Sequence, residues 1–115
     1  MTNTIVKQQF KIIQPLGQIN ASNATEFQSQ LINVLSSDEY LALLIDMQQV
    51  EFIDSAGLMV LVSSLRLAQT QRKRFGLCSV NPSIKMIFEL TQLEAAFEIF
   101  ESHDAFIAKI EAYSF

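Results

Sequence analysis

An unbroken apolar run from Leu41 to Ile45 ends at Asp46, near the middle of the chain. A strand with one face in water alternates apolar and polar side chains, whereas a strand covered on both faces stays apolar throughout. We therefore interpret Leu41–Asp46 as an interior strand of a sheet. Such a strand favours a layered fold in which other elements pack on both sides of the sheet.

Helical and strand-like segments alternate along the rest of the chain. Strand-like patterns cover 5–16, 75–80 and 97–100, and apolar residues with a helical period predict helices over 24–36 and 58–71. Two more helices are expected, one capped by Asn81 with Pro82 at its first position and a last one capped by Ser102. We predict an α/β fold, a single domain over residues 1–115, with a mixed, mostly parallel sheet of about four to five strands and about four helices.

The segment after the interior strand carries the strongest functional signal. An apolar pair is followed by an acidic residue and a serine, and a helical pattern then begins, in the order Phe52-Ile53-Asp54-Ser55-Ala56-Gly57-Leu58. This order places the Ser55 hydroxyl at the N-terminus of a helix, on the rim of the sheet. The unpaired N–H groups and partial positive charge of such an end favour an anion, including the roughly −1.5 to −2 charges of a phosphate. The motif therefore predicts a phosphorylation switch.

The same residues also fit an ordinary helix start. Asp54 or Ser55 could cap the helix by accepting its first free N–H group, as Asp and Ser often do. Gly57 is a poor helix former in that first turn, which suggests that a requirement other than helix stability keeps it there. We assign Met59, on the same helix, to the core.

Composition and charge exclude several classes of function. The chain has 115 residues, 50 % hydrophobic, with a formal charge of −4, which argues against a nucleic-acid surface. No apolar run approaches the ~20 residues of a membrane span, and the opening Met1–Thr4 lacks the basic start of a secretory signal. We therefore expect a cytoplasmic protein without membrane insertion.

The single cysteine and single histidine limit the possible cofactor chemistry. Cys78 can form no internal disulfide, and we interpret it as a small buried apolar residue. Cys78 and His103 alone cannot complete a zinc cage, and the acidic residues lack calcium-loop spacing. The chain also lacks a glycine-rich phosphate loop. We expect no metal and no cofactor, and any ATP should belong to a partner protein.

Several of these features together resemble the STAS domain, and more narrowly the small anti-sigma factor antagonists of bacteria. The features are the order of elements, a turn at Gly17-Gln18-Ile19-Asn20, the Phe52–Leu58 motif and the helix entered through Asn81-Pro82. The resemblance covers residues 8 to 112. It implies a binding module rather than an enzyme, and a single STAS-like domain.

The resemblance also implies a partner-switching cycle around Ser55. An anti-sigma factor with serine kinase activity binds the unphosphorylated form and releases the phosphorylated form, and a serine phosphatase resets the cycle. The implied partner-binding residues around the phosphorylation site are Ile19, Asn20, Asp54, Ala56 and Gly57.

Two positions depart from the pattern of the family. Ala56 replaces a second hydroxyl residue, which leaves Ser55 as the only hydroxyl of the motif. Asn20 stands where an aspartate is common, so a charge near the serine is lost, which affects the efficiency of phosphorylation or the choice of kinase.

Two alternative functions remain at this point. One is a STAS subunit of a transport or sensory assembly, in which the same surface makes a permanent contact. The other is an enzyme with Ser55 as nucleophile, for which His103 is the only histidine that could act as the base. The motif lacks the Gly-x-Ser-x-Gly pattern of a nucleophile elbow, and a histidine at a helix start is usually a surface or capping residue.

Overall fold

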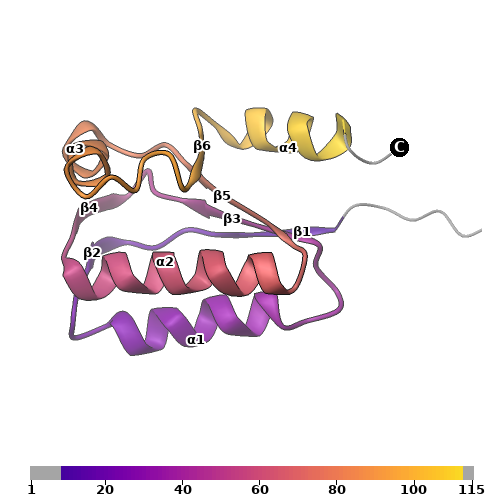
Figure 1. The fold of residues 1–115 in the computed structure, drawn as a ribbon, viewed down its shortest axis with the longest axis horizontal. Coiled ribbons are helices and arrows are strands. Elements are labelled where there is room, and N and C mark those ends of the chain that lie inside the picture. The colour runs from indigo at the N-terminus through magenta and orange to yellow at the C-terminus, as the bar shows by residue number, and fades with distance from the viewer. Residues whose placement is uncertain (1–8, 113–115) are drawn as a thin grey trace, which may run out of the picture.

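The computed structural model describes residues 9–112 as alternating strands and helices (Figure 1). The bounds of the strands are β1 Phe10–Ile13, β2 Gly17–Ile19, β3 Ala42–Asp46, β4 Val50–Ile53, β5 Arg74–Cys78 and β6 Glu98–Phe100. The bounds of the helices are α1 Ala24–Leu35, α2 Ser55–Thr70, α3 Pro82–Leu90 and α4 His103–Ala112.

The described strands form two sheets in which every pairing is parallel. Four strands make the larger sheet in the order β1-β3-β5-β6, and β2 pairs with β4 in a separate two-stranded sheet. The interior strand β3 is buried along its whole length and lies between β1 and β5. The predicted α/β fold with a largely parallel sheet is therefore confirmed.

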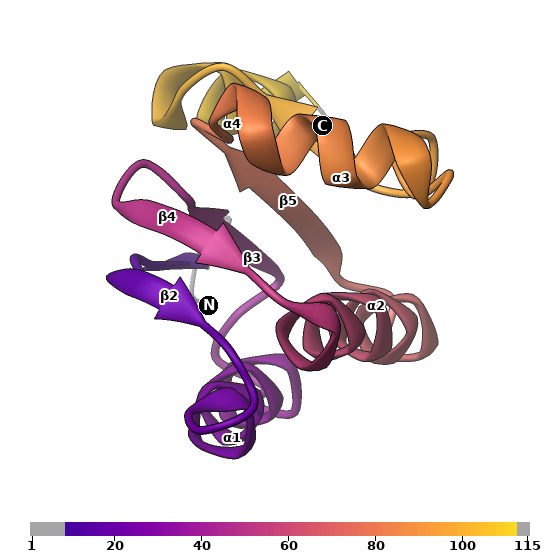
Figure 2. The same ribbon diagram turned by 90° about the vertical axis from the view of Figure 1, so that its left-hand side faces the viewer.

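Helices cover both faces of the larger sheet, so that β3 is enclosed as its apolar sequence requires. Helices α1 and α2 lie side by side on one side of the strands, and α4 lies on the other (Figures 1 and 2). The larger core cluster joins α1, α2 and α3 to the sheet through residues such as Leu31, Leu61 and Phe88. A smaller cluster beneath α4 contains Ala42, Leu44, Cys78, Phe106 and Ile110.

The start of the chain differs from the single strand expected over 5–16. Within the described residues the strand ends at Ile13, and a second strand begins at Gly17, where the expected turn over 17–20 would have started. Pro15 lies in the gap and has no N–H group to donate to a ladder. Gly17 has a φ of +72°, a left-handed conformation that glycine adopts readily. These two residues break the extended segment and redirect it towards β4.

The starts of α3 and α4 follow the sequence expectations closely. Asn81 caps α3, with its side chain accepting a hydrogen bond from the N–H of Ile84, and Pro82 is the first helical residue. Ser102 Oγ accepts a hydrogen bond from the N–H of Ala105 at the start of α4. Among the described residues, no helix is long and apolar enough to cross a membrane.

Candidate functional site

The pairing of β2 with β4 brings together two segments that are far apart in sequence. The strands end side by side at Ile19 and Ile53, and the N–H of Asp54 then donates a hydrogen bond to the carbonyl of Ile19 at 3.1 Å. The turn that begins at Asn20 therefore lies next to the start of α2, which is Ser55. The predicted site residues on either side of Ser55 and around Asn20 share one edge of the molecule.

Asp54 is the cap of α2, which decides between the two capping residues that the sequence allowed. Its Oδ1 accepts a hydrogen bond from the N–H of Gly57 at 3.0 Å, and its backbone is extended. Its other carboxylate oxygen, Oδ2, accepts from the N–H of Ala21 at 3.1 Å. One side chain thus holds both the first turn of α2 and the turn after β2, so Asp54 positions the surroundings of Ser55.

Because Asp54 occupies the cap position, the Ser55 hydroxyl is not needed to start the helix. Ser55 is the first residue of α2, and its side chain is exposed. Within the described chain, residues 9–112, no group forms a hydrogen bond with the Ser55 hydroxyl. An exposed hydroxyl without a structural role is chemically available to a modifying enzyme.

Gly57 and Ile19 lie beneath this surface rather than on it. A Cβ atom on Gly57 would come within 2.7 Å of the Ile19 carbonyl oxygen and 2.7 Å of Ile53 Cγ1. Ile19 itself is only 2 % exposed. A glycine is therefore required at position 57 because α2 packs closely against the end of β2 there. These two residues shape the site from below, whereas Asn20, Asp54 and Ala56 are partly accessible.

Asn20 orders the turn beside Ser55 through several hydrogen bonds. Its Oδ1 accepts from the backbone N–H of Ser22 at 3.0 Å and from the Ser22 hydroxyl at 2.6 Å. Its own N–H donates to Asn23 Oδ1 at 2.9 Å. The neutral amide oxygen of Asn20 thus accepts the hydrogen bonds that order this turn, so the turn does not need an aspartate at this position.

Two exposed apolar side chains lie close in sequence to Ser55, and sequence reasoning missed both. Met59 is 61 % exposed, so its assignment to the core was wrong, and Phe52 is 49 % exposed. Met59 lies four residues after Ser55 and so shares its side of α2. Phe52 alternates with the buried Ile53 in β4, which points it outward. Both spacings were visible in the sequence and could have identified two exposed apolar side chains near the serine.

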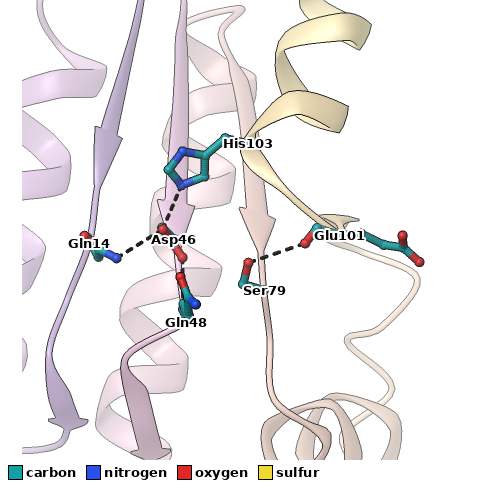
Figure 3. A network of polar contacts seen from close by, with 6 residues as sticks. All are labelled: Gln14, Asp46, Gln48, Ser79, Glu101 and His103. Atoms are coloured by element: carbon teal, nitrogen blue, oxygen red, sulfur yellow. Dashed lines mark hydrogen bonds and ion pairs between the residues drawn. The ribbon is translucent and has the colours of Figure 1, made fainter.

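The only histidine of the chain has a partner other than the serine. His103, the first residue of α4, contacts Asp46 with 2.7 Å between Nε2 and Oδ2 (Figure 3). Asp46 ends β3, whereas Ser55 follows β4. Within residues 9–112, His103 forms no hydrogen bond with Ser55, so the arrangement of nucleophile and base that a serine enzyme needs is not formed.

Comparison with protein-family models identifies one family over most of the chain. The model of the STAS domain matches residues 2–106. Among curated proteins, BtrV of Bordetella bronchiseptica, named as an anti-sigma factor antagonist, is 29 % identical over 90 residues, which cover 77 % of this chain and 76 % of BtrV.

Solved structures share the fold over nearly the whole chain. An anti-sigma factor antagonist of Thermotoga maritima superposes with a TM-score of 0.83 at 24 % identity, covering 89 % of this chain and 87 % of that one. The anti-sigma factor antagonist SpoIIAA in its unphosphorylated form gives 0.78 at 12 % identity, covering 97 % and 96 %. A sulfate transporter family protein of Wolinella succinogenes gives 0.77 at 16 % identity, covering 95 % and 90 %.

Proposed function

The chain belongs to the STAS domain family, and from this premise we propose that it is an anti-sigma factor antagonist regulated by phosphorylation of Ser55. In its unphosphorylated form it binds an anti-sigma factor that is also a serine kinase. The kinase phosphorylates Ser55 at the expense of ATP, the complex dissociates, and a serine phosphatase removes the phosphate. The chain acts in this cycle as a binding module in the cytoplasm, with residues 1–115 as one domain.

The observation that carries this proposal is the accessible Ser55 hydroxyl at the first position of α2. Asp54 caps the helix, so modification of Ser55 removes no capping interaction. With Ala56 next to it, Ser55 is the only hydroxyl residue in the motif. The names of BtrV and of the antagonists with the same fold support the same role.

The switch follows from the difference between a hydrated and a buried phosphate. In the free protein, water and the N-terminus of α2 stabilise the dianion, whereas a partner packed over Ser55 would have to remove its water. The neighbouring Asp54 carboxylate already accepts two backbone hydrogen bonds and adds a like charge. Phosphorylation therefore weakens the complex locally, without any need to rearrange the fold.

The contact surface in this proposal surrounds Ser55. Asn20, Asp54 and Ala56 contact the partner directly, while Ile19 and Gly57 hold the surface in shape from below. The exposed Met59 and Phe52 add apolar area to the surface near the serine. Protein interfaces combine apolar side chains of this kind with polar groups and hydrogen bonds.

The test is phosphorylation and binding with candidate kinases from the source organism. We expect the wild type, incubated with ATP and the cognate kinase, to gain the mass of one phosphate, and Ser55→Ala to gain none. Ser55→Asp should bind the kinase at least about tenfold more weakly than Ser55→Ala, which corresponds to about 1.4 kcal/mol. Equal binding of the two variants would contradict the proposed switch.

Ser83 provides a matched control for Ser55. It is also an exposed serine in the first turn of a helix, α3, which has its own side-chain cap at Asn81. Ser83→Ala should gain one phosphate as readily as the wild type does. If Ser83→Ala gained no phosphate while Ser55→Ala still did, the phosphorylated residue would be Ser83 on α3, and the proposed switch at Ser55 would be wrong.

A second candidate function is a permanent subunit of a transport or sensory assembly. The observation that favours it is the same fold in a sulfate transporter family protein. In that case the chain would bind a transport protein stably, ATP would add no phosphate, and Ser55→Asp would change the affinity for a kinase by less than about twofold. Intact mass and the binding assay above separate the two functions.

A further inference from the structure

A cluster of three side chains outside the Ser55 site has the composition of a transition-metal site. Asp46, Cys78 and His103 each offer one ligand atom, and these atoms all lie within 4.8 Å of one another. They come from the ends of the neighbouring strands β3 and β5 and from the start of α4. None of the three belongs to the proposed partner-binding surface.

We propose that Asp46, Cys78 and His103 bind a Zn²⁺ ion through one carboxylate oxygen, the thiolate sulfur and the imidazole Nε2. Three protein ligands and one water molecule form the usual open zinc site. Zinc accepts sulfur, nitrogen and oxygen donors together, whereas Mg²⁺ and Ca²⁺ are held almost wholly by oxygen. The mixture of donors therefore points to a metal of the zinc type.

The carboxylate is already oriented by its neighbours (Figure 3). Asp46 is only 3 % exposed. Its Oδ1 accepts from the N–H of Gln48 at 3.0 Å, and its Oδ2 accepts from Gln14 Nε2 at 3.2 Å. Hydrogen bonds of this kind fix the direction of a metal ligand and tune its strength, and their loss typically weakens metal binding by about 10–100-fold.

A cavity supplies access and room for the fourth ligand. It has a volume of about 370 Å³, and Asp46, His103, Gln14 and Asp104 are among its lining residues. Cys78 is fully buried in the cluster beneath α4 and approaches from the protein side. A metal held between these groups would face protein on the sulfur side and water on the other.

Binding requires a modest local adjustment. Ligand atoms around a tetrahedral zinc ion are about 3.3–3.7 Å apart, as follows from bond lengths of about 2.0–2.3 Å. The ion would replace the 2.7 Å contact between Asp46 and His103, and Cys78 would move closer. His103 can turn because its side chain is 42 % exposed. The thiol proton is released to solvent, and the two negative ligands balance the charge of the ion.

Cobalt(II) is the probe for this site, because a cobalt–thiolate bond gives a charge-transfer absorption that reports the sulfur directly. The experiment uses the full chain without an affinity tag, stripped with a chelator and titrated with Co²⁺. We expect one Co²⁺ per chain, a thiolate charge-transfer band, and stoichiometric loss of that band when Zn²⁺ is added.

Three variants locate the ligands. Cys78→Ala should abolish the charge-transfer band, and His103→Gln should weaken Co²⁺ binding more than about tenfold. Asp104→Asn removes another carboxylate that lines the same cavity and should leave the affinity within about twofold. Because His103 is half-exposed, His103→Gln is expected to fold even if a change at the buried Cys78 does not.

Two outcomes would overturn the proposal. One is the absence of a thiolate band at millimolar Co²⁺ in the folded wild type. The other is Co²⁺ binding that keeps its affinity in both Cys78→Ala and His103→Gln, since the ion would then bind elsewhere on this acidic chain. In either case the cluster is a structural hydrogen-bond network that fastens α4 to β3.

Discussion

At the scale of single residues, two adjacent side chains at the start of α2 have different roles, one capping the helix and the other presenting an exposed hydroxyl. Asp54 caps the helix and ties down the neighbouring turn, and Ser55 is left exposed and without a partner among the described residues. A serine that also capped the helix would lose that bond on modification. Because Asp54 caps the helix, Ser55 can be phosphorylated and dephosphorylated without loss of a capping hydrogen bond.

Gly57→Ala should destabilise the protein although alanine is the better helix former. The substitution gains about 1 kcal/mol of helix propensity. The new Cβ, however, would lie 2.7 Å from the Ile19 backbone oxygen, and overpacking of this kind typically costs about 1–3 kcal/mol or more. Because the contact is with backbone rather than with a flexible side chain, the cost should lie at the upper end of this range. We therefore expect a net loss of about 1–2 kcal/mol in the free energy of unfolding, measured with urea. Ser55→Ala, in the same helical turn but exposed, should change it by less than about 0.5 kcal/mol.

Cys78 gives the protein a specific dependence of stability on alkaline pH. Burial, followed by the charge of Asp46, raises the pKa of the Cys78 thiol above its ordinary value of 9.0 in the folded state, although a hydrogen bond with Ser79 opposes the shift. Above pH 9 the unfolded chain loses the thiol proton while the folded chain keeps it, so the free energy of unfolding falls as pH rises. The slope is at most about 1.4 kcal/mol per pH unit.

The measurement compares wild type with Cys78→Ala in a chelator at pH 8 and pH 10. The free energy of unfolding of the wild type, relative to that of Cys78→Ala, should be lower at pH 10 than at pH 8. A difference that does not change between these pH values would show that the folded and unfolded chains hold the thiol proton equally.

At the scale of elements, α4 is attached to the sheet by a small cluster of its own. Phe106 and Ile110 pack on Ala42, Leu44 and Cys78, apart from the larger core under α1 and α2. A helix held by few apolar contacts at one end of the chain can open without unfolding the rest. The buried Cys78 thiol would then become accessible whenever α4 detaches.

Phe106→Ala should therefore accelerate the labelling of Cys78 by a thiol reagent at least about a hundredfold, in the presence of a chelator. Truncation of a buried phenylalanine typically costs about 3–5 kcal/mol, and here the cost falls on the contact between α4 and the sheet. Phe27→Ala on α1 is the matched control, since it makes the same truncation in the other core cluster. Equal acceleration by both variants would mean that Cys78 is labelled only through global unfolding.

The elements with a strong local pattern were the ones that the sequence predicted well. The apolar run of β3 and the Asn81-Pro82 start of α3 each identify an element from neighbouring residues alone. The pairing of β2 with β4 was missed, because strands of three and four residues carry little periodicity and their partners lie far away in sequence. The grouping of Asp46, Cys78 and His103 was missed for the same reason, since only the folded sheet brings these residues together.

At the scale of the whole molecule, the parallel topology places chemistry at the ends of strands. The strand β4 leads into Ser55, whereas β3 and β5 end at Asp46 and Cys78. The ends of parallel strands are where α/β proteins usually bind ligands and partners. The strand ends of the two sheets thus carry the two proposed sites, with the Ser55 hydroxyl after β4 and the proposed metal ligands Asp46 and Cys78 at the ends of β3 and β5.

Phosphorylation of Ser55 should leave the fold of the whole molecule unchanged while it prevents partner binding. The phosphate would lie on an exposed helix start that already has its cap, so no core contact is broken. We expect the circular dichroism spectrum to be unchanged and the thermal midpoint to shift by less than about 4 °C, equivalent to less than about 1 kcal/mol. Affinity for the kinase should fall at least about tenfold in the same sample. A larger drop in the midpoint, together with a changed spectrum, would instead show that phosphorylation acts by disturbing the fold.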